Sequence, residues 1–341
     1  MAGELVFITG ATGHLGFRVL VDALEAGYKV RAAIRSQAKG DKILATPSIK
    51  ELNPGNKLEF IIVPDMLAEG AYSEGIKGAT YAIHVASPLA SAYKDGDDAQ
   101  KILIEPAVKG TLNILNAAQG SSVKRVVITS SVVAIMPWSA VVSAENEVVW
   151  DEKSRTPTPS GPFLMGAFEA YSASKVAALN STEKWISEKK PAFDVVNIFP
   201  SFIVGADELV TDAKDALNGT NYTIIKPAIG QDASYAPGCS IHLKDVALAH
   251  VKALDPKVLG NQGYILSSLG LDGTKWEDVF EIIKRKFPDE VAKNILPNNG
   301  SIVSGPIKID EKRSEEIFGM KYRGFEEQVE DVVNFYLSLL V

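Results

Sequence analysis

The amino-acid sequence predicts an α/β protein: a doubly wound parallel sheet followed by a smaller C-terminal lobe. Through the first 205 residues, nearly unbroken apolar runs alternate with segments of helical periodicity. This alternation is the pattern of strands that are buried on both faces of a parallel sheet. A glycine-rich turn directly follows the first apolar run. After residue 205 the alternation breaks down, so we expect a second, loop-rich part.

The first part contains six expected strands and several helices. The strands are the apolar runs at 5–8, 28–35, 58–65, 78–88, 123–131 and 193–200. Helical spacing follows from residue 17, within 38–56, at 98–118 and at 170–190. His84 lies inside an apolar strand, and we expect it to be a core histidine. The second part has loops over 206–240, a helix ending near 254, a strand near 263 and amphipathic helices at 275–287 and 324–339.

The glycine-rich turn predicts a nucleotide site. Gly10, Gly13 and Gly16 stand at intervals of three between the first strand and the first helix. In a dinucleotide-binding fold such glycines permit a tight turn, close approach of a pyrophosphate and close packing of helix on strand. The N-terminus of the helix adds unpaired N–H groups and a partial positive charge that favour phosphate. We therefore expect a Rossmann-like domain.

The end of the second strand indicates which dinucleotide is bound. NAD-binding folds place an acidic residue about 20 positions after the glycines, where it binds the ribose hydroxyls. Here that position holds Arg35, and Lys39 and Lys42 follow. A guanidinium binds a 2′-phosphate through paired, charge-assisted hydrogen bonds, whereas a carboxylate repels it. The sequence thus favours NADP(H) over NAD, although a solvated basic loop would look the same.

Composition excludes several other classes of protein. The 341 residues carry a net charge of −7 without a basic cluster, which argues against nucleic-acid binding. Cys239 is the single cysteine, so the chain has no disulfide framework and no ligand set for a zinc dehydrogenase. No apolar run is long enough to span a bilayer, and the first strand leaves no room for a signal peptide. We expect a cytoplasmic protein that binds neither membranes nor metals.

A tyrosine and a lysine four residues apart predict acid–base chemistry. Tyr171 and Lys175 share one face of the helix expected at 170–190. A nearby ammonium favours the phenolate and lowers the pKa of the tyrosine from about 10, which makes it a usable general acid for a carbonyl oxygen. Ser131, at the end of a neighbouring strand, would bond the same oxygen.

The same spacing recurs at Tyr222 and Lys226. Pro227 follows at once, the intervening residues include β-branched ones, and no strand ending in serines precedes it. We therefore expect no helix at 222–226 and interpret this copy as coincidence.

Together these motifs resemble the extended short-chain dehydrogenase/reductase family, in the branch of dihydroflavonol reductases and fungal aldehyde or ketone reductases. The resemblance extends over residues 4–250. It rests on the segments at 9–16, 30–35, 84–88, 129–131, 171–175 and 200–205.

The resemblance implies roles for individual residues. Ser131, Tyr171 and Lys175 would form the catalytic triad. The implied cofactor-binding residues are Gly10, Thr12, Gly13, His14, Leu15, Gly16, Arg35, Lys42, Asp65, Met66, Val85, Ala86, Ser87, Thr129, Tyr171, Lys175, Pro200 and Ile203. Residues 1–205 would form the NADP-binding domain, with its sheet completed by segments near 238–268, and 206–341 mainly the substrate-binding lobe.

One departure from the resemblance bears on substrate. Flavonoid-specific members carry polar residues after the strand that ends in serine, whereas here residues 132–138 are apolar. We therefore expect hydrophobic aldehydes or ketones, ketoesters among them, rather than a dihydroflavonol. The pocket residues would be Ser87, Met136, Trp138, Phe163, Phe202 and Tyr222.

The expected activity is NADPH-dependent reduction of a small carbonyl compound to an alcohol. One alternative is a sterol- or sugar-nucleotide-acting dehydrogenase or epimerase of the same superfamily, which would usually prefer NAD. Another is a non-catalytic redox sensor that binds NADP, although such sensors tend to lose the tyrosine and lysine. Both a monomer and a homodimer fit the sequence.

Overall fold

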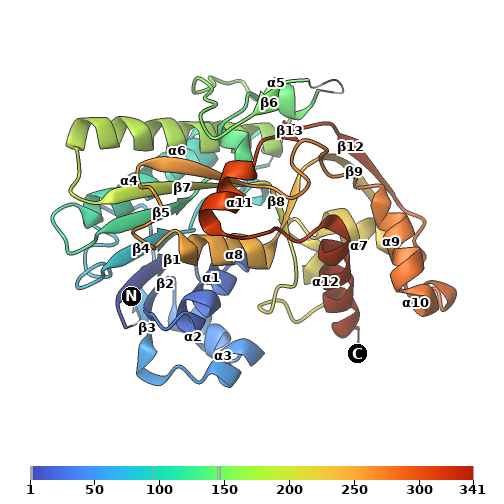
Figure 1. The fold of residues 1–341 in the computed structure, drawn as a ribbon, viewed down its shortest axis with the longest axis horizontal. Helices are drawn as coiled ribbons and strands as arrows, with labels where there is room; N and C mark the ends of the chain where they lie inside the picture. The colour runs from blue at the N-terminus through green and yellow to red at the C-terminus, as the bar shows by residue number, and fades with distance from the viewer. Residues whose placement is uncertain (1–2, 95, 144, 146, 341) are drawn as a thin grey trace. The chain divides into compact units, whose positions relative to one another are not determined.

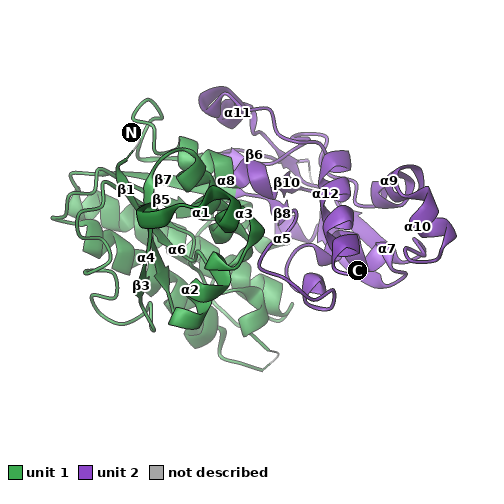
Figure 2. Cartoon of the chain, turned by 90° about the horizontal axis from the view of Figure 1, so that it is seen from below, with its two compact units in different colours: residues 1–138, 152–199, 247–264 green, residues 139–151, 200–246, 265–341 purple. Residues whose placement is uncertain are grey.

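The computed structural model describes residues 3–94, 96–143, 145 and 147–340. The chain divides into two compact units (Figure 2). Unit 1 comprises residues 1–138, 152–199 and 247–264, and unit 2 comprises 139–151, 200–246 and 265–341. Within the described part of the chain, no helix combines the length and the apolar character needed to cross a membrane.

A seven-stranded sheet forms the centre of unit 1, in the order β11-β7-β5-β4-β1-β2-β3 (Figure 1). Its strands are β1 (Leu5–Thr9), β2 (Lys29–Ile34), β3 (Leu58–Ile62), β4 (Tyr81–His84), β5 (Arg125–Thr129), β7 (Asp194–Pro200) and β11 (Gln262–Leu266). Neighbouring strands from β3 to β7 pair in parallel. The predicted doubly wound α/β fold is confirmed.

Helices cover both faces of this sheet (Figure 1). They are α1 (His14–Glu25), α2 (Gln37–Leu44), α3 (Pro47–Leu52), α4 (Glu105–Ala118), α6 (Ala167–Lys189) and the end of α8 (Leu243–Lys252). Short 3₁₀ turns lie at η1 (Gly55–Lys57), η2 (Ala90–Ala92) and η4 (Val132–Ala134). Helices α4 and α6 pack against each other on the face opposite α1.

The long helix expected at 98–118 consists of two parts. A π-helical turn, η3 (Gln100–Ile104), leads into α4. Pro106 lies in the first turn of α4, where its missing N–H removes no helix hydrogen bond. The methyl group of Met66 packs in the space that a side chain at Gly110 would fill.

The order of the strands creates a crevice beside β1. From β1 the chain runs outward to β2 and β3, then crosses over to β4 on the opposite side of β1. Ligands of open α/β sheets bind at the carboxyl ends of the strands at such a switch point. Gly10 follows β1 and Val85 follows β4, and the two loops are joined by the bond from Val85 N to Thr9 O (3.2 Å).

Strand β5 is bound to α8 and the loop after it at both of its ends. At its start, buried Arg125 donates to the carbonyl oxygens of Ala253 and Asp255 (2.8 and 2.7 Å) and pairs with Asp194 (3.0 Å). At its end, the Thr129 hydroxyl bonds His250 Nε2 (2.7 Å). These contacts lie within unit 1 and position the strand that leads to Ser131.

Unit 2 contains three two-stranded pairs and several short helices. The strands are β6 (Val149–Trp150), β8 (Phe202–Val204), β9 (Asp232–Pro237), β10 (Ser240–His242), β12 (Ser301–Gly305) and β13 (Lys308–Ile309). The helical segments are α5 (Trp138–Val141, whose first residue belongs to unit 1), η5 (Asp215–Leu217), α7 (Tyr222–Ala228), α9 (Asp278–Lys286), α10 (Pro288–Ala292), α11 (Lys312–Phe318) and α12 (Phe325–Ser338). Buried Trp276 packs between Phe202 and Phe325 in its core.

The expectation that residues 222–226 are not helical is wrong. They form most of α7, and Pro227 lies near its C-terminal end. A proline there removes one intrahelical hydrogen bond from a seven-residue helix, and the last turn is closed by bonds from Ile229 N and Gln231 N. Pro227 therefore limits the length of this helix but does not prevent the helix from forming.

The glycine turn makes a testable prediction about stability. A Cβ at Gly16 would overlap the carbonyl group of Gly10, whereas a Cβ at Gly13 would meet the same oxygen at 3.6 Å, an ordinary contact. Gly16→Ala should lower the free energy of unfolding of the cofactor-free protein by about 1–3 kcal/mol, measured by urea denaturation. Gly13→Ala is the matched control and should cost less; equal losses would contradict the steric account.

Candidate active site

The glycine turn presents backbone donors to the crevice. Gly10 adopts a φ of 78°, and a Cβ there would overlap the backbone of Ala86. Gly13 is exposed and caps α1 without a side-chain hydrogen bond. The N-terminus of a helix favours an anion because its first N–H groups have no partner within the helix. Thr12, His14 and Leu15 lie in or beside the first turn of α1.

Two basic residues stand at the neighbouring strand end. Arg35 directly follows β2 and Lys42 belongs to α2, and both side chains are exposed. Asp65 follows β3, and its Oδ1 accepts a hydrogen bond from Leu67 N (2.8 Å). Burial raises the pKa of Tyr72, and of the charges that act on it Arg35 lowers the pKa and Asp65 raises it. An exposed guanidinium and a carboxylate at this edge of the sheet thus act on the same buried phenol.

The loop that carries Met66 is held by α4. Asn113 Nδ2 donates to the carbonyl oxygens of Met66 and Ala68 (2.9 and 3.0 Å). Together with the packing of Met66 on Gly110, these bonds fix the segment after β3 beside the crevice.

The segment after β4 lies between the glycine turn and α6. Ala86 N donates to the Thr9 hydroxyl (3.3 Å), which ties this segment to the end of β1. Ser87 Oγ accepts a hydrogen bond from Lys175 Nζ (3.1 Å). Val85, Ala86 and Ser87 are all half-buried, so their backbone forms one wall of the crevice.

Tyr171 and Lys175 lie on one face of α6, as the spacing predicts. Lys175 Nζ lies 5.6 Å from the centroid of the Tyr171 ring and also reaches the Thr129 carbonyl oxygen (3.5 Å). Burial lowers the pKa of Lys175 to about 8. Burial also raises the pKa of Tyr171 to about 12.

The expected lowering of the tyrosine pKa is therefore wrong for this cofactor-free chain. The Lys175 ammonium is directed to Ser87 and Thr129 at the strand ends, and burial dominates the phenol. The raised pKa keeps Tyr171 protonated, which is the form that a general acid requires.

Ser131 begins the turn that follows β5. It caps η4, and its Oγ accepts a hydrogen bond from Val133 N (3.3 Å). Ser172, next to Tyr171 on α6, donates to Val133 O (3.3 Å). The turn of Ser131 and the helix of Tyr171 are thus bonded to each other. The Thr129 hydroxyl faces His250, so it is the Thr129 carbonyl that faces the lysine.

Aromatic side chains extend from Tyr171 along the start of α6. Phe168 packs edge-on against Tyr171, with ring centroids 6.0 Å apart, and Trp138 lies 6.4 Å from Phe168. Phe163 and Tyr171 both pack against a buried cluster of Ala99, Leu103 and Ala170. Met136 has no exposed surface, so its predicted place in a substrate pocket does not agree with the structure. It points into the core because residues 132–136 pack as a buried turn.

Four of the predicted site residues belong to unit 2. Pro200 ends β7, Phe202 and Ile203 lie in β8, and Tyr222 begins α7. Lys226 Nζ lies 5.3 Å from the Tyr222 ring, so this second pair reproduces the local geometry of Tyr171 and Lys175.

Comparison with known proteins identifies the family. The model of the NAD dependent epimerase/dehydratase family matches residues 6–266. The chain belongs to this family. Its members include the extended short-chain dehydrogenases and reductases that the motifs resemble, and the chain is an oxidoreductase.

Relatives of this family match over nearly their whole length. The chain is 40% identical to Ketoreductase CTB6 of Cercospora nicotianae, over 99% of this chain and 96% of that protein. It is 37% identical to NAD-dependent epimerase/dehydratase ALT6 of Alternaria alternata, over 96% of each. The crystal structure of Gre2 in complex with NADPH from Candida albicans superimposes with a TM-score of 0.82 at 27% identity, covering 98% of this chain and 99% of that chain.

Sequence reasoning missed the exposed apolar residues that precede α6, the helix that carries Tyr171. Leu164 is 84% exposed and Met165 58% exposed, and Met165 Sδ accepts a hydrogen bond from Trp138 Nε1 (3.2 Å). Both residues belong to a stretch without periodicity, so no pattern marked them. A signal was present: two large apolar residues stand within seven positions of Tyr171 in a polar, proline-rich loop.

The buried ammonium predicts an unusual dependence of stability on pH. Lys175 is charged in both states below its folded pKa of about 8, and burying that charge opposes folding. Between about 8 and the model-peptide pKa of 10.5, the unfolded chain binds the extra proton, so stability rises with pH. Cofactor-free Lys175→Met should therefore be more stable than the native chain at pH 7 by about 1–3 kcal/mol.

Thermal unfolding between pH 7 and pH 10.5 tests this prediction, and the advantage of Lys175→Met should shrink across that range. Lys226→Met is the matched control, because half-buried Lys226 has the same placement over a tyrosine ring. A pH-independent difference between Lys175→Met and the native protein would contradict the buried-charge account.

Proposed function

We propose that this oxidoreductase uses NADPH to reduce hydrophobic aldehydes and ketones, including ketoesters, to alcohols. The observation that carries the proposal is the buried Lys175 beside Tyr171, bonded to Ser87 after β4 and to Thr129 at the end of β5, on one side of the glycine turn. A cationic group, a phenol and a phosphate-binding turn at one switch point are what carbonyl reduction by a nicotinamide requires.

The residues of the crevice fit a dinucleotide. Backbone atoms of Ala86 and Gly10 occupy the places where Gly10 and Gly16 would carry side chains, so the turn stays tight, and the N-terminus of α1 would offer N–H groups to a pyrophosphate. Arg35 and Lys42 supply exposed positive charge where a 2′-phosphate would lie. NADPH bound in this crevice would supply a hydride to the carbonyl carbon of the substrate.

Residues of the chain would supply the proton that the substrate oxygen takes up. As the carbonyl carbon gains the hydride, the oxygen gains negative charge and takes the phenolic proton of Tyr171. Lys175 would stabilise the phenolate that remains, and the Ser131 hydroxyl would donate a hydrogen bond to the same substrate oxygen. The products are the alcohol and NADP⁺, and a proton from solvent restores Tyr171.

The preference for NADP(H) rests on Arg35 and on the relatives. No carboxylate stands directly after β2, where a ribose-binding acidic residue would discriminate against the 2′-phosphate. Gre2 of Candida albicans, at 27% identity, was solved with NADPH.

The substrate class follows from the surface in front of α6. Trp138, Phe168 and the exposed side chains of Leu164 and Met165 form an apolar surface beside Tyr171. Such a surface favours the hydrocarbon part of a substrate, and the relative from Cercospora nicotianae is named a ketoreductase. Ser87 and Phe163 of unit 1, and Phe202 and Tyr222 of unit 2, are proposed as further substrate contacts.

Removal of the phenolic hydroxyl tests the mechanism. Tyr171→Phe should lower kcat by about 100- to 10,000-fold, because the substrate oxygen loses its proton donor, while the Kd for NADPH should stay within about threefold because the ring remains. The assay is NADPH consumption with a panel of aromatic aldehydes and ketoesters. Tyr336→Phe on α12 is the control and should retain full turnover. Turnover near the wild-type rate in Tyr171→Phe would remove this residue from the mechanism.

A charge reversal tests the choice of cofactor. Arg35→Asp should raise the KM for NADPH by about 10- to 100-fold, the size of a lost charge-assisted phosphate contact, and leave the KM for NADH nearly unchanged. Lys57→Asp makes the same kind of charge change at the amino ends of the strands, whereas Arg35 lies at their carboxyl ends. Lys57 directly precedes Leu58, which pairs with Val30 near the start of β2. That control should alter neither constant. Equal effects of Arg35→Asp on both cofactors would refute the phosphate role.

A further inference from the structure

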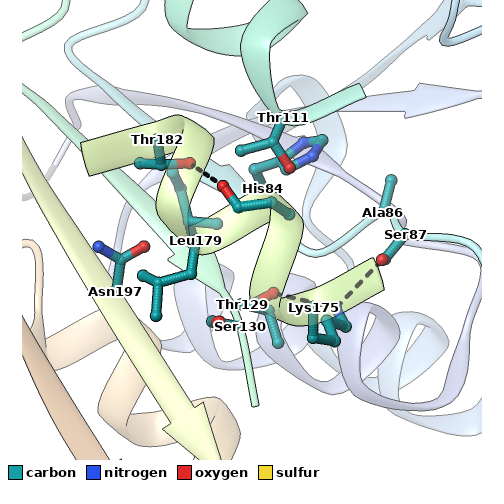
Figure 3. A pocket seen from close by; sticks show the side chains of 12 residues that line it. His84, Ala86, Ser87, Thr111, Thr129, Ser130, Lys175, Leu179, Thr182 and Asn197 are labelled. Atoms are coloured by element: carbon teal, nitrogen blue, oxygen red, sulfur yellow. Dashed lines mark hydrogen bonds between the residues drawn. The ribbon is translucent and has the colours of Figure 1, made fainter. Parts of the chain in front are cut away.

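A small interior cavity lies beneath the Lys175 ammonium, within unit 1 (Figure 3). It offers about 10 Å³ for the centre of a water molecule, which is room for one. Polar side chains from β4, β5, α4 and α6 line it, among them His84, Ser87, Thr111, Thr129, Lys175 and Thr182. A buried site of this size with several polar partners is one that water occupies in proteins.

His84 contributes a buried N–H to this site. The Thr9 hydroxyl accepts from Ala86 N and lies 2.8 Å from His84 Nδ1, and we assign the hydroxyl as the donor to that nitrogen. Burial, together with the charge of Lys175, lowers the pKa of His84 to about 3, so the ring is neutral. The remaining proton is therefore on Nε2, and among the described residues Nε2 has no hydrogen-bond partner.

Among the residues that the structure describes, the Lys175 ammonium has acceptors for two of its three N–H groups. One is bonded to Ser87 Oγ (3.1 Å) and a second reaches Thr129 O (3.5 Å). A buried donor without an acceptor costs about 1–3 kcal/mol. A water in the cavity would accept from both Lys175 and His84.

The cavity also offers acceptors for the hydrogens of that water. The hydroxyls of Thr111 and Thr182 donate to the helix carbonyl oxygens of Ala107 and Ala178, and their oxygens keep lone pairs that can accept a hydrogen bond. Figure 3 shows Thr111 and Thr182 among the residues that line the cavity. Among the described lining residues, the groups that titrate are His84 and Lys175. Tyr171, whose ring lies 5.6 Å from Nζ, is the other titratable group beside the ammonium.

We propose that one water molecule occupies this cavity and accepts hydrogen bonds from His84 Nε2 and from the third N–H of Lys175. His84 is then a positioning residue: it holds the water, and the water holds and solvates the ammonium. The consequence for catalysis rests on the proposed function, in which Lys175 must be charged to stabilise the phenolate of Tyr171. Without the water the buried charge is less well solvated, and Lys175 loses its proton at lower pH.

A crystal structure of the wild-type protein with NADPH, at a resolution that shows ordered waters, tests the site itself. We expect one density peak within hydrogen-bond distance of both His84 Nε2 and Lys175 Nζ. A dry cavity, or a water bonded to neither nitrogen, would overturn the proposal. This readout does not depend on turnover, so it separates failure of the water site from failure of the carbonyl-reductase proposal, which Tyr171→Phe decides.

The pH dependence of kcat tests the effect on Lys175. His84→Phe keeps an aromatic ring against Tyr72 but has no N–H, and the alkaline limb of its kcat profile should move down by about one pH unit. His84→Gln restores an N–H donor and should return the limb towards the wild-type position. An alkaline limb that stays in place in His84→Phe, with kcat reduced equally at every pH, would show a merely structural role and overturn the positioning role.

Discussion

The close approach of three backbone segments at Gly10 is the constraint on which the crevice depends. The carbonyl group of Gly10 occupies the space where Gly16 would carry a side chain, and Ala86 occupies the space beside Gly10 itself. Helix α1 can therefore begin directly over the end of β1, and the loop after β4 can lie against both. A larger residue at either glycine would separate these segments and displace the N–H groups that face a phosphate. The proposed cofactor site thus depends on backbone packing, and the exposed side chains of Arg35 and Lys42 would add the choice between cofactors.

A second constraint is the burial of a charge. The Lys175 ammonium lies at the ends of β4 and β5, where Ser87 and the Thr129 carbonyl accept its hydrogen bonds. Burial lowers the pKa of Lys175, whereas it raises the pKa of Tyr171. Burial thus moves the two pKa values apart: that of Lys175 falls from 10.5 to about 8, while that of Tyr171 rises from 10.0 to about 12. A positively charged nicotinamide or a developing alkoxide would act on this balance during turnover.

The sequence predicts the sheet, the crevice and the residues beside it because each rests on a local pattern. Apolar runs mark the strands, three glycines mark the turn, and a four-residue spacing places Tyr171 and Lys175 on one helix face. Features that depend on packing across the chain were not accessible in this way. The helix at Tyr222, the complete burial of Met136 and the direction of the Tyr171 pKa all follow from neighbours distant in sequence. The exposed Leu164 lies in a loop whose conformation no periodicity specifies.

Strand β5 is attached to α8 and the loop that follows it by Arg125 at one end and Thr129 at the other. A slip of one residue in the register of β5 would move both anchors by about 3.3 Å, far more than a hydrogen bond tolerates. The register of β5 is therefore set by α8 and the loop after it, as well as by the neighbouring strands of the sheet. Ser131 follows the second anchor, Thr129, by two residues. A shift in the register of other strands therefore does not displace Ser131. The position of the Ser131 hydroxyl, which would bond the substrate oxygen, is thus set by α8 and the loop after it, outside the crevice.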